Sequence, residues 1–357
     1  MNDMKPAVAI RVAIAGIGNC ASSLIEGISH YREHPDDDTG LLFPILGGYS
    51  VRDIEFVAAF DISSHKVARA LGEAIRQPPN NFVRIPGVNV DERVVVQRGP
   101  TLDGNPPHLA LFVPGAPESP INVVQVLRES GAEVFVNLLP TGSFEATAFY
   151  ADAALNARCA FINCIPAVLA QKPEIDDRFR REKLPILGDD IKSQLGTTIL
   201  HRTLLRMLQL RGAVLERTSQ VDIGGNTDLA NCVHRGESKV VSTRKSMEGL
   251  LEGAAFHAGH HYDLTRAPLR NALLEVDATV FGGSHVRISA SLESDDKPNG
   301  AGSIVDLIRI AKAARDEGKG GIIPEACALY MKSPPVPMDE EEALEMIGRN
   351  WVVKTTR

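Results

Sequence analysis

The first part of the chain alternates short apolar runs with segments of helical spacing. Apolar runs occupy residues 9–15, 54–60, 109–113, 134–139, 160–163 and 184–187, and helix-like segments occupy 21–28, 65–75, 122–130 and 143–156. Short apolar runs that alternate with amphipathic segments predict strands that alternate with helices. This order predicts an α/β domain built on a doubly wound parallel sheet.

The pattern changes after residue 190. Residues 197–211 have the spacing of a long amphipathic helix, whereas 213–223, 272–281 and 285–292 resemble longer strands. The last two alternate apolar with polar or small residues, which is typical of an antiparallel sheet with one exposed face. Residues 301–315 are helical again. We therefore expect one domain from 1–190 and 303–357, with C-terminal helices packing back, and an inserted α+β domain from 191–302.

Composition narrows the class of protein. The 357 residues are 44% hydrophobic and 23% charged, with a net charge of −7 and no dense Lys/Arg stripe, which argues against a nucleic-acid surface. No apolar run approaches the length of a membrane span, and the N-terminus lacks a signal-peptide pattern. The five scattered cysteines contain no CxxC motif, so we expect a reducing, cytoplasmic environment without disulfides or a zinc cage.

A glycine-rich turn follows the first predicted strand. In Gly16-Ile-Gly-Asn-Cys-Ala, Gly16 permits a tight turn, Gly18 lets the backbone approach a phosphate, and Ala21 is small enough for helix–strand packing. The N-terminus of the following helix favours negative charge. The turn therefore predicts a dinucleotide site, although a glycine turn between a strand and a helix can also be a simple connection.

Asp61 ends the second predicted strand, where its carboxylate can accept hydrogen bonds from ribose hydroxyls and disfavour a 2′-phosphate. NAD is therefore the expected cofactor. The number of residues between Gly16 and Asp61 exceeds the usual spacing of about 20 residues between the glycine turn and this carboxylate. We assign the extra residues to an insertion at 31–52. The alternative is that Asp61 only caps a helix that begins near Ser63.

Two further loops carry candidate ligand contacts. Residues 137–143 (NLLPTGS) follow a strand, where open α/β sheets bind ligands, although Ser143 could simply cap the next helix. In residues 188–198 (GDDIKSQLGTT), adjacent carboxylates could orient a cofactor amide or a cation, and hydroxyls could cradle a phosphate at the helix start. A capped helix with a solvated acidic turn is the alternative.

Isolated charged residues later in the chain are ambiguous. Three later features could contribute to a site: the segment GGNTD at 224–228, Lys239 and Lys332. Taken alone, however, a lysine is usually a surface residue. His260 and His261 are expected in a loop, and no metal-binding spacing occurs, so the need for a metal is left open.

Taken together, six motifs carry a resemblance. GIGNCASSL, FVAAFD, GDDIKS, GGNTD, ESK and YMKSPP occur in this order from Gly16 to Pro335. The set resembles the myo-inositol-1-phosphate synthase family in its shorter archaeal and actinobacterial form. The resemblance implies a Rossmann domain with tightly held NAD, and a second domain that carries the active site and forms a homotetramer. It also implies conversion of D-glucose 6-phosphate to 1D-myo-inositol 3-phosphate through C5 oxidation, enolisation, aldol closure and re-reduction.

The resemblance also assigns roles to residues. Lys239 would serve the C5 oxygen, Lys332 the C1 oxyanion, and Asp190 the nicotinamide. The polar positions around the sugar would be Asn226, Asp228 and Asp296. The phosphate contacts would be Ser193, Gly196, Thr197 and Arg270. The cofactor contacts would be Gly16, Gly18, Asn19, Cys20, Ala21, Asp61, Thr141, Gly142, Asp189 and Asp190.

Two positions depart from the family pattern. Thr243 and Ser291 stand where the family usually has lysines. Arg270 could compensate by binding phosphate in a forked geometry, but it would not titrate like a buried lysine. Two alternatives therefore stay open: a related enzyme that acts on another sugar phosphate or cyclitol by the same chemistry, and a non-catalytic NAD-binding protein. Retention of both Lys239 and Lys332 argues against the second.

Overall fold

A seven-stranded sheet forms the centre of the first lobe in the computed structural model, which describes residues 9–352. Its order is β5 (Val96–Arg98), β4 (Ile54–Asp61), β1 (Ile10–Ala15), β6 (Val134–Asn137), β7 (Ala160–Asn163), β8 (Pro185–Leu187) and β13 (Gly321–Ile322). All of its strand pairs are parallel. Counted along the sheet, the first six strands have the order 3-2-1-4-5-6 of a Rossmann fold. The predicted parallel α/β sheet is confirmed.

Helices cover both faces of this sheet, and the strands β6, β7 and β8 are therefore buried along their whole length. On one face, α1 (Asn19–Glu33) packs along the long helix α10 (Asp296–Asp316), and both contribute to one core cluster. On the other face lie α4 (Val123–Glu129), α5 (Phe144–Asn156) and α6 (Pro173–Arg181). The C-terminal helices α11 (Pro324–Tyr330) and α12 (Glu340–Asn350) pack against one another and join the first cluster.

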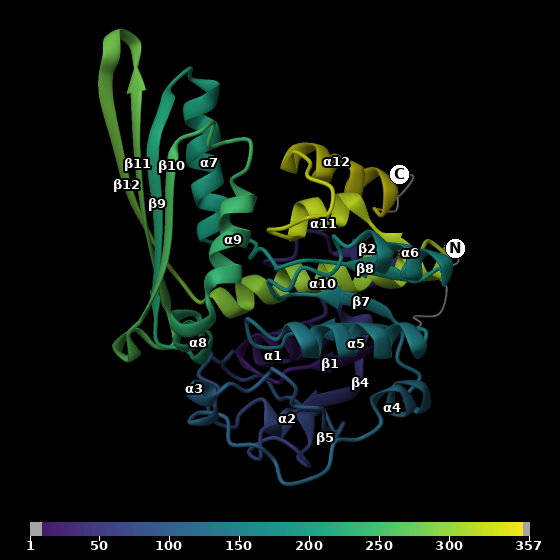
Figure 1. Cartoon of the computed structure of the whole chain (residues 1–357). Helices are drawn as coiled ribbons and strands as arrows, with labels where there is room; N and C mark the ends of the chain where they lie inside the picture. The colour runs from purple at the N-terminus through teal and green to yellow at the C-terminus, as the bar shows by residue number, and fades with distance from the viewer. Residues whose placement is uncertain (1–8, 353–357) are drawn as a thin grey trace.

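A second, four-stranded sheet stands to one side of the first lobe (Figure 1). Its order is β10 (Ala255–Tyr262), β9 (Val214–Gly224), β11 (Arg270–Val280) and β12 (Ser284–Ser294). Only the β10–β9 pair is parallel, so the sheet is largely antiparallel, as expected. Helices α7 (Thr197–Leu210) and α9 (Glu237–Ser246) cover one face, and α8 (Thr227–Arg235) lies at its base (Figure 1).

Several predicted elements differ in the structure. Residues 109–113 form the end of α3 (Pro107–Ala110) and a turn, not a strand; Leu109 is buried, but Leu111 is 85% exposed. The helix expected at 65–75 is mostly turns, with helix only in α2 (Leu71–Ala74). His260 and His261 lie in strand β10 and not in a loop. The expected domain boundary at 302/303 falls inside α10.

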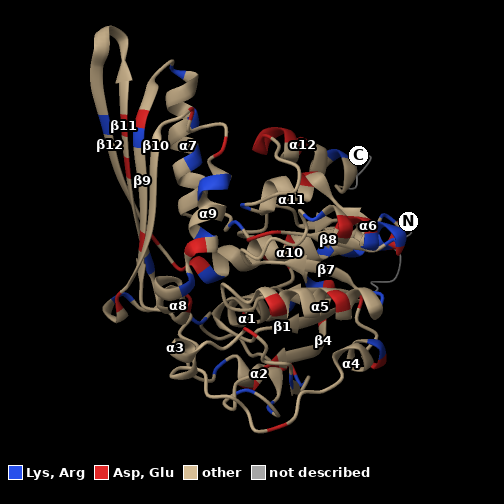
Figure 2. Ribbon diagram, viewed as in Figure 1, with Lys and Arg blue, Asp and Glu red and all other residues tan. Residues whose placement is uncertain are grey.

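The insertion after α1 forms a small hairpin of β2 (Ile45–Leu46) and β3 (Tyr49–Ser50), followed by a short 3-10 turn at Val51–Asp53. Arg309 of α10, fully buried, donates to the carbonyls of Pro44 and Tyr49 and so fixes the hairpin to the core. Figure 2 shows basic and acidic residues interspersed over both lobes. Within residues 9–352, no helix is long and apolar enough to cross a membrane.

Candidate active site

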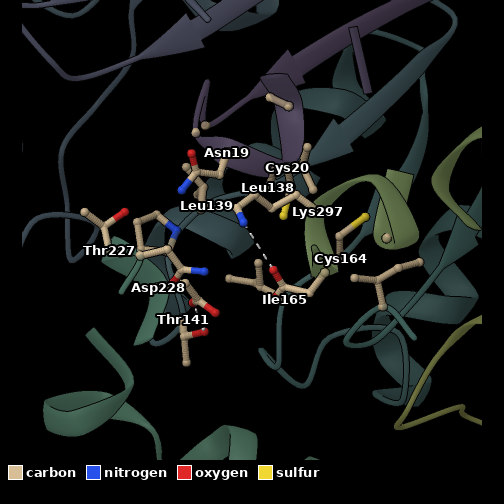
Figure 3. Close-up of a pocket in the computed structure, with 18 of the residues that line it drawn as sticks. Asn19, Cys20, Leu138, Leu139, Thr141, Cys164, Ile165, Thr227, Asp228 and Lys297 are labelled. Atoms are coloured by element: carbon tan, nitrogen blue, oxygen red, sulfur yellow. Dashed lines mark hydrogen bonds and ion pairs between the residues drawn. The ribbon is translucent and has the colours of Figure 1, made fainter. Parts of the chain in front are cut away.

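A cavity lies between the two lobes, at the carboxyl ends of the central strands β1 and β6, where open α/β sheets bind ligands. Figure 3 shows residues from both lobes around it, including Asn19 and Cys20 from α1, Thr227 and Asp228 from α8, and Lys297 from α10. A second cavity continues along the glycine turn to Asp61, and a small polar one lies at the start of α7. Three connected sets of residues therefore line one elongated site.

The glycine turn has the geometry that a phosphate site needs. Gly16 has φ +86°, and a Cβ added there would lie 2.4 Å from the carbonyl oxygen of Leu138. Gly18 is extended, and no atom lies within 4 Å of a Cβ built on it. Gly16 is thus required by the fold, whereas Gly18 leaves open space beside the N-terminus of α1 for a bound group.

Asp61 combines the two roles that the sequence left open. One carboxylate oxygen accepts from the amides of Ile62 and Ser63, and the other accepts from Ile17 at 2.8 Å. The carboxylate therefore fixes both the glycine turn and the turn after β4. Since each oxygen can accept two hydrogen bonds, the oxygen bound to Ile17 can still accept one from a ribose hydroxyl.

Lys239 and Asp228 form the central ion pair. The Lys239 Nζ lies 2.6 Å from Asp228 Oδ2, and the lysine side chain is 11% exposed. Burial, the largest single influence, would lower the pKa of Lys239, but the Asp228 carboxylate together with Cys232 and Asp190 outweighs burial and raises that pKa well above its ordinary value. Thr141 donates to the other Asp228 oxygen at 3.3 Å. The pair therefore joins the loop after β6 to helices α8 and α9.

The tail segment returns to the site beside the loop after β8. The amide of Lys332 donates to the carbonyl of Asp190 at 2.7 Å, and a β-bridge joins Ile191 to Met331. This pairing places the Lys332 Nζ 3.8 Å from an Asp190 oxygen. Residues far apart in the sequence, one before the second lobe and one after it, thus meet at the cavity.

The small polar cavity lies at the N-terminus of α7 and is lined by Ser193, Gly196, Thr197, Thr198, Gln220, Arg270, Ser294, Asp296 and Lys332. Arg270 lies between two carboxylates, with its nitrogens 2.9 Å from Asp222 and 2.9 Å from Asp296. Burial would raise the pKa of Asp222, but Arg270 outweighs this effect and lowers it to about 2. A helix N-terminus, hydroxyls and a buried guanidinium are typical of a phosphate site.

Two of the predicted cofactor residues lie away from these cavities. The Cβ of an alanine at Gly142 would collide with the Arg235 side chain, so this glycine faces α8. The Asp189 carboxylate is fully buried and accepts from the amides of Leu169 and Ala170, and burial raises its pKa to about 6. Both residues support the walls of the site. All the other predicted site residues line at least one of the three cavities.

The two departures from the family pattern lie outside the cavities. Thr243 is buried inside α9, and Ser291 is exposed on β12.

The structure adds two residues that were not expected. Lys297, 2% exposed, lines the main cavity. His260 lies near the central ion pair, and burial together with the Lys239 ammonium lowers its pKa to about 4. In the sequence, the only sign of a role for Lys297 is its place in the charged segment DDKPNG. Nothing in the sequence indicated that His260 lies in a strand beside the ion pair.

No group of three or more His, Cys, Asp or Glu side chains suited to a metal ion occurs in the part of the chain that the structure describes. The question of a metal therefore stays open, as it did from the sequence. The chemistry available at the site comes from ammonium groups, carboxylates and the open space beside the glycine turn.

Comparisons with known proteins agree with this geometry. The family model of myo-inositol-1-phosphate synthase matches residues 196–297. The inositol-3-phosphate synthase of Corynebacterium glutamicum is 41% identical over 352 residues, which cover 95% of this chain and 97% of the relative. That of Mycolicibacterium smegmatis is 41% identical over 94% of this chain and 95% of the relative. The crystal structure of Ari2 superposes with a TM-score of 0.80 at 34% identity, covering 96% of this chain and 98% of that one. The chain belongs to the myo-inositol-1-phosphate synthase family.

Proposed function

We propose that this chain is an NAD-dependent inositol-3-phosphate synthase that converts D-glucose 6-phosphate into 1D-myo-inositol 3-phosphate. The observation that carries the proposal is that the Lys239–Asp228 pair and Lys332 line the same cavity as the glycine turn. Identity of 41% to curated inositol-3-phosphate synthases, over nearly the whole of both chains, supports it.

The residues present fit NAD. Gly18 offers space for a pyrophosphate at the start of α1, and Asp61 keeps one free acceptor for a ribose hydroxyl while its negative charge opposes a 2′-phosphate. Bound there, NAD would supply a reversible hydride acceptor for the sugar. Asn19, Cys20, Thr141 and Asp190 line the main cavity beside the glycine turn, and we assign them to the nicotinamide half.

The phosphate of the substrate fits the polar cavity at the start of α7. The amides at the N-terminus of this 14-residue helix point toward an anion there, and Ser193 and Thr197 supply hydroxyls. Arg270 and Lys332 supply positive charge from two other elements. This placement directs the remainder of the sugar toward Lys239 and Asp228 in the main cavity.

Lys239 and Lys332 then act at the two oxygens on which charge develops. The Lys239 ammonium donates to the oxygen on C5, and Asp228, which holds this ammonium at 2.6 Å, keeps it charged and oriented. The Lys332 ammonium donates to the oxygen on C1 during ring closure. Asn226 caps α8 through its side-chain oxygen, so its amide nitrogen is free to bind a sugar hydroxyl. Asp296 takes part through Arg270.

We further propose that the protein is a homotetramer, as the resemblance implies. In a single chain, α7 and α9 cover one face of the four-stranded sheet, and Figure 1 shows the opposite face without a covering helix. Contact between such faces would bury this sheet. The cytoplasmic location stays a prediction.

The test is a direct assay. The purified protein is incubated with glucose 6-phosphate and NAD, and inositol phosphate is followed by NMR or by phosphate release after periodate. We expect product without net consumption of NAD. A protein that retains bound NAD but forms no product would contradict the proposal, and a Lys332→Ala variant with full activity would contradict the role of Lys332.

A second candidate is an enzyme that performs the same chemistry on a related sugar phosphate or cyclitol. The observation in its favour is the loss of two family lysines at Thr243 and Ser291, together with the unexpected Lys297 in the cavity. Turnover of another hexose phosphate at a higher kcat/KM than glucose 6-phosphate would favour this candidate.

A further inference from the structure

Lys297 occupies a position that is electrostatically unfavourable for a lysine. It lies in the first turn of α10, where the helix dipole opposes positive charge, and its side chain is only 2% exposed. Removing an ammonium group from water is also costly unless it is paired. A buried cation at a helix N-terminus beside a ligand cavity therefore needs local compensation.

Carboxylates and a carbonyl provide this compensation. The Lys297 Nζ donates to the carbonyl of Pro268 at 2.5 Å and to Asp295 Oδ1 at 2.7 Å. It also lies 3.6 Å from Asp296 Oδ1, an oxygen that is buried and has no hydrogen-bond partner. The other oxygen of Asp296 accepts from Arg270. Asp296 is thus shared between the lysine and the arginine.

The shared carboxylate belongs to a row of alternating charges. From α10 to β9 the row runs Lys297, Asp296, Arg270 and Asp222, and Thr197 at the start of α7 donates to Asp222 at 3.1 Å. The row therefore connects the main cavity to the polar cavity that suits a phosphate. A change in charge at the lysine end acts on the arginine through one carboxylate.

The net charge of this row depends on Lys297. Two cations, Lys297 and Arg270, face three carboxylates, Asp222, Asp295 and Asp296, so the formal charge is −1. Without Lys297 it becomes −2, and Asp296 would interact with Arg270 alone. A phosphate dianion would then meet a more negative site, in which the guanidinium is fully neutralised by its own two carboxylates.

We propose that Lys297 is a positioning residue for phosphate binding: it takes up part of the Asp296 charge, so that more of the Arg270 charge is left to attract the phosphate group of the substrate. This inference rests on the proposed function only in that the ligand is a sugar phosphate. The lysine acts at a distance from the reacting carbons, and its effect is on affinity for the phosphate monoester.

Binding measurements on the NAD-saturated protein test the proposal without turnover. Calorimetry with inorganic phosphate and with glucose 6-phosphate is compared for the wild type, Lys297→Gln, Lys297→Arg and Asp296→Asn. Lys297→Gln keeps a donor for the Pro268 carbonyl but removes the charge. The matched control is Lys312→Gln, another buried lysine of α10, which pairs with Asp316 and Glu133 and lines none of the three cavities.

We expect Lys297→Gln to raise the Kd of both ligands about tenfold, and Lys297→Arg to stay within about threefold of the wild type. Asp296→Asn should lower the Kd of inorganic phosphate several-fold, because it removes a negative charge; a purely structural role predicts no such gain. Lys312→Gln should leave both Kd values unchanged.

Two results would overturn the inference. One is an unchanged Kd in folded Lys297→Gln; the other is a Kd that fails to fall in Asp296→Asn, which decides the matter even when Lys297→Gln does not fold. Failure of the proposed function looks different: the wild type would bind both ligands, and the variants would shift Kd as expected, but no inositol phosphate would form.

Discussion

The wall of the cavity on the Rossmann side consists mainly of backbone and small side chains, whereas the wall on the side of the second lobe consists of ionic side chains. The first wall is the turn of Gly16 and Gly18, with the carboxylate of Asp61 fixed by three backbone amides. The second wall contains Lys239 with Asp228, and Arg270 between two carboxylates.

The difference shows how each wall recognises its ligand. Backbone geometry offers space and oriented amides that suit any pyrophosphate, and it does not depend on the protonation of a side chain. Paired ionic side chains fix charge at chosen points, where each cation is held by a carboxylate from another element. We therefore expect substitutions on the first wall to act on folding and cofactor binding, and substitutions on the second to act on catalysis and to depend on pH.

The largest expected effect belongs to the second wall. Lys239→Met removes the donor to the C5 oxygen and leaves Asp228 without its cation, so kcat should fall about 10²- to 10³-fold. NAD binding, measured by fluorescence titration, should stay within about twofold, because the glycine turn is untouched. Lys319→Met, at an exposed lysine, is the control. A kcat within threefold of the wild type would contradict the assignment.

The two glycines of the first wall should respond differently. At Gly16, an alanine combines a left-handed φ with a Cβ 2.4 Å from the Leu138 oxygen, so the free energy of unfolding should fall by about 3 kcal/mol. Gly18→Ala meets no atom and should cost less than about 1 kcal/mol, but its methyl group projects into the space for the cofactor.

Urea unfolding and NAD titration of both variants separate these effects. We expect Gly18→Ala to keep its unfolding midpoint and to weaken NAD binding about tenfold. Equal losses of stability in the two variants would show that the turn is only a connection between β1 and α1.

The same contrast explains how much the sequence could predict. The glycine turn lies within six consecutive residues, and its strand–turn–helix context follows from local periodicity, so the Rossmann sheet and the turn were both predicted. The Lys239–Asp228 pair was reached only through family resemblance. The row from Lys297 to Asp222 could not be predicted, because it combines α10, β11 and β9, whose relative placement depends on tertiary packing. His260 was assigned to a loop because it follows Gly259 in the sequence, whereas the structure places both residues within the continuous strand β10.

A smaller effect is expected from pH at His260, on the side of the second lobe. His260 has a pKa of about 4 because of burial and of nearby Lys239 and Arg270, which outweigh the opposing charges of Asp222 and Asp228. The folded state therefore keeps the imidazole neutral while the unfolded chain takes up a proton below about pH 6.5. Stability due to this residue is present above that pH and is lost as the pH falls toward 4.

Urea unfolding between pH 7 and 4.5 measures this loss. His260 should contribute a decrease of about 2 kcal/mol in the free energy of unfolding across the range, allowing for partial exposure of the ring, while protonation of buried Asp189, whose pKa is raised to about 6, acts in the opposite direction in both the wild type and the His260→Gln variant. His260→Gln should reduce the slope by that amount, and the imidazole NMR signal of His260 should not move before about pH 5. A signal that titrates near pH 6.5 would mean that the ring is in solvent. The expected difference in pH dependence between the two walls would then be absent at His260.

The smallest expected effect tests where the second wall ends. Ser291→Lys restores a family lysine, but Ser291 is exposed on β12, pairs with Leu273 and lines none of the three cavities. A lysine there should extend into solvent, so KM for the sugar phosphate should change less than about twofold and the free energy of unfolding less than about 0.5 kcal/mol. Steady-state kinetics and urea unfolding measure both. A tenfold fall in KM would mean that a lysine on β12 reaches the phosphate group of the substrate. Phosphate binding would then depend on β12 as well as on the row of charges from Lys297 to Asp222.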